Sequence, residues 1–251
     1  MAKSEKIWQA GPLRIRVSAE APEERPRERL TRDRIVDVAL AQMKEKGYEA
    51  VSMRSIAKEL GTGPASLYAH VANRDELDQL VVDRISGLVP SPEPDPERWD
   101  EQVVEYLHTV LGVYRAHPGA ARATMGMIPT MPGPLRNAED LMSLCVAGGI
   151  PEQYAAWACD MFALFIGAVA VEEDIWAERG KSAAAAGRAY TEEAVVAAVR
   201  EHFAALPPEQ YPLLSSHAQE MTQGSGEDRV GFALDLLVAG LKSMAQDKPR
   251  Q

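Results

Sequence analysis

The sequence of 251 residues predicts an all-α protein, with a small helix-turn-helix domain followed by a larger helical domain. Three observations support this prediction. Apolar residues recur every three or four positions over long stretches, as they do on the buried face of a helix. No stretch shows the sustained alternation of apolar and polar residues that is typical of a half-buried strand. Glycine, proline and capping residues fall at the ends of the periodic stretches, where helices begin and end.

The chain begins with residues 1–29, a charged and proline-containing stretch that predicts a flexible arm. The first domain is predicted over residues 30–90. Thr31 is a suitable N-cap for its first helix, whose apolar positions recur every four residues and which ends near Gly47.

Residues 52–76, SMRSIAKELGTGPASLYAHVANRDE, predict two short helices joined by a tight turn. The first ends at Gly61, because glycine readily adopts the left-handed conformation of a helix C-cap. Pro64 suits the first turn of the second, where its missing N–H would have no partner anyway. Such a pair is a helix-turn-helix, whose second helix enters the major groove of DNA. We therefore expect this domain to bind duplex DNA.

A fourth helix is predicted after Asn73, a suitable N-cap, with Asp75 and Glu76 in its first turn. Three prolines in residues 91–97, SPEPDPE, cannot continue a helix. The boundary between the two domains is therefore placed at residue 91.

The second domain is predicted over residues 91–246, with a tail at 247–251. Small side chains over residues 180–190, GKSAAAAGRAY, predict a flexible connection. The longest apolar run is too short to span a bilayer, so no membrane partner is expected. The helices of the second domain are expected over residues 99–115, 120–125, 135–146, 151–178 and 191–206, and from 225 onward.

Acidic residues are concentrated in the second domain. Residues 1–90 contain 15 Lys and Arg against 14 Asp and Glu, whereas residues 91–251 contain 12 against 23. An acidic body avoids DNA phosphates. The nearly neutral first domain must therefore bind DNA through a few well-placed basic residues rather than through a broad positive field.

Motifs and spacing argue against a metal site, a disulfide framework and catalysis. Cys145 and Cys159 lie in apolar helical segments and are expected to be reduced thiols of a cytoplasmic protein. The histidines have no metal-ligand spacing, and no GxSxG, phosphate-binding loop or HExxH occurs. We expect no metal, no cofactor and no enzymatic activity.

The segments LTRDRIVDVALAQMKEKGYEAVSMRSIAKELG and LYAHVANRDEL, within residues 30–85, resemble the DNA-binding domain of the tetracycline-repressor (TetR) family. Residues 229–244, RVGFALDLLVAGLKSM, more weakly resemble the last helix of the subgroup that includes the tetracycline repressors themselves. The resemblance implies a dimeric DNA-binding regulator with a helical ligand-binding domain.

The resemblance also implies which residues contact DNA. An arginine entering the first motif helix can hold a phosphate or a base edge, the exposed start of the second helix lies nearest the bases, and flanking polar groups bind phosphates. Arg54 could instead pair with Glu59, and the arm arginines, Arg25, Arg27 and Arg29, could either reach DNA or have no role. The expected contacts are Arg54, Thr62, Gly63, Pro64, Ala65, Ser66, Tyr68, His70 and Arg74.

Two segments are expected to form the interface of a homodimer. Residues 155–171 are apolar on almost every face, and the last helix carries an apolar stripe. Both could simply fill a monomer core, but the resemblance favours a four-helix bundle with two helices from each subunit. The expected interface residues are Phe162, Phe165, Val230, Leu234, Leu237 and Leu241.

The resemblance places a ligand pocket among the helices after residue 98. Aromatic and methionine side chains there suit a hydrophobic or amphipathic molecule of drug size. Tetracycline is not expected, because the family's drug-binding and magnesium-binding histidines fall near Pro90 and Thr124, which cannot replace imidazole as a metal ligand. The expected pocket residues are Trp99, Tyr106, His108, His117, Met125, Met131, Trp157, Phe162 and Phe165.

These features predict a ligand-responsive transcriptional regulator. In the simplest form it is a repressor that a small molecule releases from a palindromic operator, by favouring a conformation whose DNA-reading helices no longer match the two half-sites. The alternatives are a ligand-independent dimeric DNA-binding regulator and a helical adaptor with a vestigial helix-turn-helix. Activation in place of repression stays open as an alternative.

Overall fold

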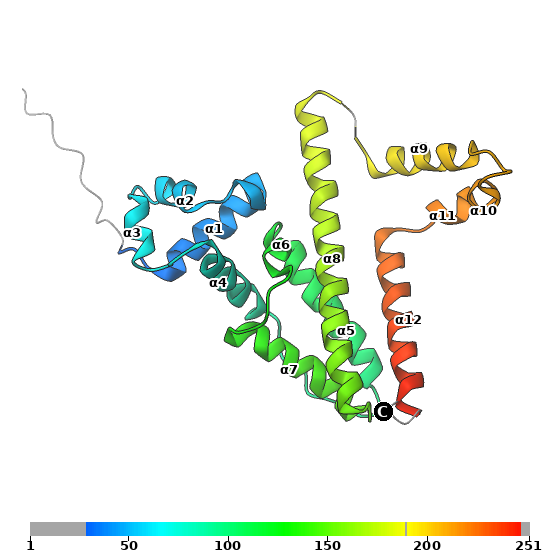
Figure 1. Cartoon of the computed structure of the whole chain (residues 1–251), viewed down its shortest axis with the longest axis horizontal. Helices are drawn as coiled ribbons and strands as arrows, with labels where there is room; N and C mark the ends of the chain where they lie inside the picture. Colours follow the sequence, from blue (N-terminus) through cyan, green and yellow to red (C-terminus); the bar gives the residue numbers. More distant parts are fainter. Residues whose placement is uncertain (1–28, 189, 247–251) are drawn as a thin grey trace, which may run out of the picture. The chain divides into compact units, whose positions relative to one another are not determined.

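A computed structural model describes residues 29–188 and 190–246, and this part of the chain is helical without any strand (Figure 1). The predicted all-α fold is confirmed. The predictions for the arm, apart from its last residue, and for the tail at 247–251 lie outside the described residues.

The first half contains four helices and one 3₁₀ turn. Each predicted cap is confirmed at the N-terminus of its helix: the side chains of Thr31 and Asn73 accept hydrogen bonds from backbone N–H groups three residues on, at 3.2 and 2.8 Å. The elements are α1 (Arg32–Lys46), η1 (Tyr48–Ala50), α2 (Met53–Glu59), α3 (Pro64–Tyr68) and α4 (Arg74–Ser86).

The turn between α2 and α3 has the hydrogen bonds of a glycine-capped helix. Gly61 has φ +62° and donates to the carbonyl of Lys58 at 3.2 Å, while the N–H of Thr62 donates to the carbonyl of Ala57 at 2.9 Å. A residue with a Cβ would be strained at this φ. The glycine therefore sets the angle at which α3 leaves α2.

The described residues after residue 90 contain eight helices, two more than the sequence predicts. The additional ones, α10 and α11, have five residues each, too few for a periodic pattern. Their order is α5 (Trp99–Ala116), α6 (Ala120–Thr124), α7 (Pro132–Ala147), α8 (Glu152–Ala185), α9 (Glu192–Ala204), α10 (Pro212–Ser216), α11 (Ala218–Thr222) and α12 (Gly226–Gln246).

Two predicted boundaries are wrong. α8 continues to Ala185, through most of the expected flexible connection, because the alanines there are the strongest helix formers. α7 starts at Pro132, three residues early, because proline is well tolerated at the first positions of a helix. Ser225 and Asp228 form a capping box at the start of α12, with reciprocal bonds of 3.1 and 2.8 Å.

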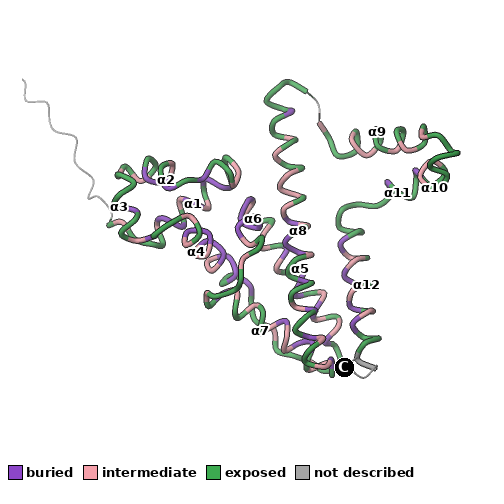
Figure 2. Tube along the Cα trace, in the orientation of Figure 1, coloured by how far each residue is buried: buried purple, intermediate pink, exposed green. Residues whose placement is uncertain are grey.

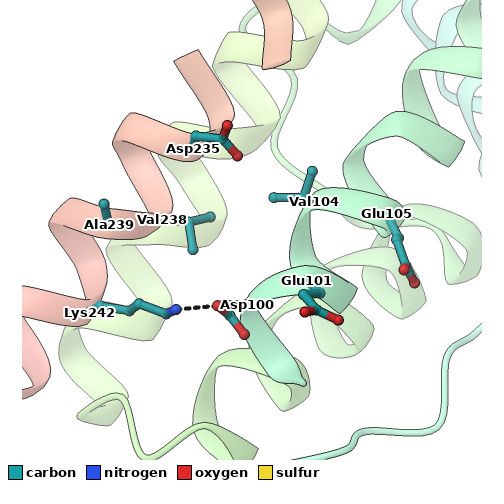
Figure 3. Close-up of a pocket in the computed structure, with 8 residues that line it drawn as sticks. All are labelled: Asp100, Glu101, Val104, Glu105, Asp235, Val238, Ala239 and Lys242. Carbon is teal, nitrogen blue, oxygen red and sulfur yellow. Dashed lines mark hydrogen bonds and ion pairs between the residues drawn. The ribbon is translucent and has the colours of Figure 1, made fainter. Parts of the chain in front are cut away.

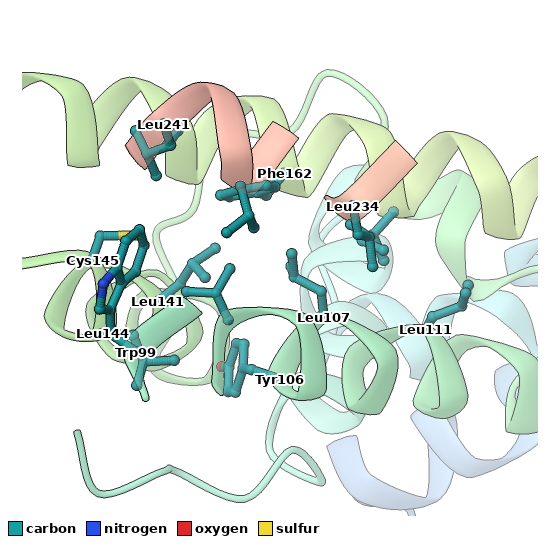
Figure 4. Close-up of a cluster of buried hydrophobic side chains, with 14 of the residues drawn as sticks. Trp99, Tyr106, Leu107, Leu111, Leu141, Leu144, Cys145, Phe162, Leu234 and Leu241 are labelled. Carbon is teal, nitrogen blue, oxygen red and sulfur yellow. The ribbon is translucent and has the colours of Figure 1, made fainter. Parts of the chain in front are cut away.

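Helices α5, α7, α8 and α12 share one hydrophobic core, drawn in Figure 4. α4 packs against α6 and α7, so the described residues from Thr31 onward belong to one compact unit. The core residues labelled in the figure are Trp99, Tyr106, Leu107, Leu111, Leu141, Leu144, Cys145, Phe162, Leu234 and Leu241.

Most of the predicted dimer stripe lies in this core and cannot face a partner. Phe162 and Leu234 are fully buried within the protomer, Val230 and Leu241 are nearly so, and Leu237 packs against the core from its edge. The physical reason is that α12 packs on both α5 and α8, so its most regular apolar stripe is used inside the protomer.

The same two helices also have exposed positions (Figure 2), and large apolar side chains occupy several of them. On α8 these are Trp157, Met161 and Leu164, at the i, i+4, i+7 spacing of one helical face. On α12 they are Phe232 and Leu236, which are 69% and 60% exposed. We call these five residues the α8–α12 face.

α8 is the one described helix that is long and apolar enough to cross a bilayer by composition. It packs against α5, α6, α7 and α12, as the central helix of a globular domain does. By contrast, α9 has no buried residue and packs mainly on α10 and α11.

Candidate DNA-binding surface and ligand cavity

The start of α3 presents an exposed surface around one buried anchor. Leu67 is fully buried and holds the helix on the core, whereas Pro64, Ala65 and Ser66 are exposed. Tyr68, at the end of the helix, is 53% exposed. The helix therefore faces outward with the small side chains that the sequence predicts to lie nearest the bases.

Residues beside α3 extend this surface. Arg54 on α2 is exposed and has no ion-pair partner among the described residues, so the alternative pairing with Glu59 is not formed. Thr62 and His70 are half-buried, and the His70 carbonyl accepts a 2.7 Å hydrogen bond from Arg32. Lys58, on α2 as well, is exposed.

Arg74 is half-buried and its guanidinium contacts groups of the protein, whereas the family resemblance makes it a phosphate contact. Its Nε lies 2.9 Å from both carboxylate oxygens of Asp78, its Nη1 donates to the carbonyl of Val51, and its guanidinium carbon lies 4.3 Å from the centre of the Tyr48 ring. Tyr48 in turn donates to Asp78 at 2.7 Å. These four residues, the Arg74 clamp, join α4 to the segment that leads into α2.

The clamp is partly buried. Asp78 is 7% exposed, and burial, together with the Asp78 carboxylate, raises the pKa of Tyr48. Arg74 was taken for a phosphate contact because sequence alone does not show whether a helix-entry arginine points to solvent or to a carboxylate one turn on.

A cavity of about 510 Å³ lies in the second half of the molecule, within the range of small-molecule sites. Helices α4 to α8 and the loop after α6 provide its walls. Its lining residues are Val82, Ser86, Tyr106, Leu107, Val110, Tyr114, Thr124, Met125, Gly126, Met127, Pro129, Pro134, Asn137, Ala138, Leu141, Cys159, Asp160, Ala163, Leu164 and Ile166.

Two family profiles match the chain. Residues 35–78 match the family described as bacterial regulatory proteins, tetR family, and residues 91–245 match the tetracyclin repressor-like, C-terminal domain. The chain belongs to the TetR family.

Relatives with solved structures have the same fold. ActR of Streptomyces coelicolor, crystallised in complex with actinorhodin, is 34% identical, with a TM-score of 0.76 over 88% of this chain and 99% of that chain. ActR has also been crystallised in complex with (S)-DNPA, with a TM-score of 0.74 over 86% of this chain and 99% of that chain.

Two of the named relatives are transcriptional repressors. The repressor DrrR1 of Streptomyces coeruleorubidus is 26% identical over 230 residues, which are 90% of this chain and 83% of that protein. The class E tetracycline repressor of Escherichia coli is 24% identical over 225 residues, covering 88% and 94% of the two chains. These matches and the ligand-bound relatives confirm the predicted function at the level of ligand-responsive transcriptional regulation by a TetR-family protein.

Two of the residues predicted for the TetR-family ligand pocket, Tyr106 and Met125, line the cavity. Trp99 and Phe162 are buried in the core and are not among the lining residues. Trp157 is 63% exposed and belongs to the α8–α12 face.

Four other predicted pocket residues lie elsewhere. The His117 Nδ1 lies 2.8 Å from the backbone carbonyl oxygen of Val113 on α5, and the His108 Nδ1 lies 3.4 Å from a carboxylate oxygen of Glu227. Met131 is the N-cap of α7. Phe165 lines a different cavity, of about 780 Å³, between α8, α9 and the start of α12. Apolar and aromatic side chains on a helix face either a core or a cavity, and periodicity does not separate the two.

The cavity has polar groups that sequence reasoning missed. Tyr114 and Thr124 line it, and the side-chain oxygen of Asn137 is buried without a hydrogen-bond partner. Asn137 and Asp160 are single polar residues in amphipathic helices, which in sequence look like any solvent-facing position. No sequence signal could have identified them.

A shallow groove between α5 and α12 differs from the cavity, because several acidic side chains line it (Figure 3). Asp100, Glu101, Glu105 and Asp235 line it, and Lys242 pairs with Asp100. Negative charge of this kind repels DNA phosphates. Among the described residues, no three His, Cys, Asp or Glu side chains are placed to hold a metal ion.

Close contacts connect the cavity walls to α1–α4, the half of the molecule that contains the helix-turn-helix (the DNA-reading half). The N–H of Gly119, which precedes α6, donates to Asp174 of α8 at 2.7 Å. A Cβ at Gly119 would lie 3.4 Å from Met43 of α1 and from the N of Tyr48, so α6 rests directly on the DNA-reading half. On the other side of the cavity, the N–H of Gly133 donates to Asp83 of α4 at 2.8 Å.

Proposed function

We propose that the chain is a homodimeric repressor that binds an inverted-repeat operator through α2 and α3, and that a small molecule in the α4–α8 cavity releases it. It acts in the cytoplasm as a binding protein and catalyses no reaction. One observation supports this most strongly: α4 serves both sites. Its first residue, Arg74, holds the DNA-reading segment, and Val82 and Ser86 near its other end line the cavity.

The proposed dimer uses the α8–α12 face. Its five large apolar side chains are exposed on two helices that pack on each other, which is costly in water and typical of an interface between subunits. A second copy can bury the same face by twofold symmetry, giving a bundle of two helices from each subunit. Two linked DNA-reading units are also needed because one helix-turn-helix contacts a single half-site.

The proposed switch depends on the packing of α4 against its neighbours. A Cβ at Gly133 would lie 2.6 Å from the carbonyl oxygen of Asp83, so α7 and α4 touch without spare space. A ligand that fills the cavity between them favours a wider arrangement, and α4 moves the DNA-reading unit with it through the Arg74 clamp. A coupling of about 1–3 kcal/mol is typical of such switches.

The ligand-bound relatives support the same assignment. ActR is similar over most of both chains and binds actinorhodin. We infer by analogy that the cavity of this chain also takes a small molecule.

The proposal is tested by selecting genomic DNA fragments on the purified chain and sequencing them. An inverted repeat shared by the retained fragments is expected, with affinity that falls steeply as salt rises. Arg54→Ala and Tyr68→Phe should weaken retention while the circular dichroism spectrum stays unchanged. If the wild-type chain retains no fragment at low salt, the adaptor alternative is favoured. If DNA is retained but no small molecule changes it, the ligand-independent alternative is favoured.

A further inference from the structure

The ligand cavity has one charged side chain in its wall, the carboxylate of Asp160 on α8. Asp160 is exposed, and neither an ion pair nor a hydrogen bond of its side chain is formed within the described residues. The exposed lining residues Ala138, Asp160 and Ala163 mark the mouth of the cavity between α7 and α8. The mouth therefore carries an uncompensated negative charge.

One residue of the cavity wall, Asn137, has an unsatisfied side-chain acceptor. The side-chain oxygen of Asn137 is buried and has no hydrogen-bond partner. The Tyr106 hydroxyl makes two long hydrogen bonds, 3.4 Å to the backbone carbonyl oxygen of Asn137 and 3.5 Å to a carboxylate oxygen of Asp140. Buried polar groups are normally paired, so a ligand that donates a hydrogen bond here would satisfy the site.

The surroundings of the cavity disfavour anions. Burial raises the pKa of the Tyr106 hydroxyl, reinforced by the Asp140 carboxylate, and burial also raises the pKa of Tyr114. Among the described residues, no lysine or arginine belongs to the lining. Arg136, on the same helix as Asn137, donates to the carbonyls of Ser86 and Val89, both at 3.3 Å.

We propose that the ligand class of this cavity is a cationic amphiphile: a ring-containing apolar body inside, a hydrogen-bond donor at Asn137, and a protonated amine at Asp160. This inference rests on the proposed function, because it names the ligand of the same cavity. Anions of equal size lack a counter-charge in the wall, whereas an amine at the mouth gains a charge-assisted hydrogen bond.

A matched series of anthracene probes tests the charge preference. 9-(Aminomethyl)anthracene, 9-anthracenemethanol and 9-anthracenecarboxylate share one ring body and are cationic, neutral and anionic at neutral pH. Their fluorescence is titrated with the full chain at fixed salt. The ammonium probe should bind about tenfold more tightly than the alcohol, in line with a hydrogen bond between charged groups. The carboxylate should bind most weakly. Equal affinities, or a preference for the carboxylate, would overturn the proposal.

Variants assign the preference to named residues. Asp160→Asn should reduce the affinity of the ammonium probe about tenfold and leave the alcohol within about twofold. Glu152→Gln removes the same charge from an exposed position eight residues earlier on α8, outside the cavity lining, and should change neither. Asn137→Leu should abolish the advantage of 9-anthracenemethanol over 9-methylanthracene. An equal loss in the Asp160 and Glu152 variants would show a general surface effect and contradict the site.

The same preparations distinguish this inference from the proposed function. If genomic fragments are retained but the order of affinities among the anthracene probes is reversed, the proposed ligand class is wrong and the proposed regulatory function is unaffected. If the order is as expected but no DNA is retained, the cavity assignment stands and the repressor proposal fails.

Discussion

The role of Arg74 is the point at which the family resemblance and the structure differ most clearly. The family resemblance makes Arg74 a phosphate contact, whereas the structure uses its guanidinium on Asp78, Val51 and Tyr48. Arg74→Met keeps the apolar stem and removes the charge. The two interpretations predict different consequences for stability and for DNA binding.

The expected loss of stability follows from the contacts. Asp78, with a side chain only 10% exposed, would keep a single donor, Tyr48. Breaking a buried pair by removing one partner costs about 3–5 kcal/mol, and the 31% exposure of the Arg74 side chain reduces this to about 2–3 kcal/mol. For a chain of this size that is a fall in Tm of roughly 4–12 °C.

The assay combines thermal unfolding with a salt titration of DNA binding below the Tm. Arg74→Met should lower the Tm and leave the slope of log K against log salt unchanged. Arg54→Met is the matched control, because Arg54 is exposed and unpaired among the described residues. It should leave the Tm unchanged and reduce the slope by about one. If Arg74→Met instead keeps the Tm and reduces the slope, Arg74 contacts phosphate and the clamp argument is wrong.

Three further predictions follow from packing and charge. Leu236→Glu, on the α8–α12 face, should give folded monomers by sedimentation, whereas Leu234→Glu, in the core, should unfold the protomer; a Leu236 variant that stays dimeric would contradict the interface. Gly133→Ala should cost about 1–3 kcal/mol and weaken operator binding, because its Cβ meets the Asp83 carbonyl; unchanged stability by urea denaturation would show that α4 and α7 separate freely. Burial raises the pKa of Asp174, so the folded chain binds its proton more readily than the unfolded chain, and Asp174 makes the free energy of unfolding fall as pH rises above the usual carboxyl range. Asp174→Asn, which can still accept from Gly119, should remove this dependence and be at least as stable as wild type at pH 7; a loss of more than about 1 kcal/mol would argue that the charge itself is needed.

Local signals in the sequence predicted the DNA-reading half well. Caps such as Thr31 and Asn73, the glycine at 61 and the proline at 64 act within a few residues of the chain, so their geometry is independent of distant packing. Arg74 is the exception because its partners on η1 and α4 depend on how these elements meet.

The cavity and the interface could not be predicted in the same way. Both Trp99 and Tyr106 are aromatic residues at apolar positions of α5, yet only Tyr106 lines the cavity. α12 has apolar residues on two faces, and the more regular stripe, through Leu234, fills the protomer core. Only the three-dimensional packing shows that Phe232 and Leu236 remain for a partner.

The central claim is that two copies of the α2–α3 surface read one symmetric site. Hydroxyl-radical footprinting on a retained genomic fragment tests it most directly. The account predicts two protected half-sites related by twofold symmetry, about one helical turn (~34 Å) or a multiple of it apart, both lost with Arg54→Ala. A single protected segment, or a footprint that Arg54→Ala leaves intact, would contradict it.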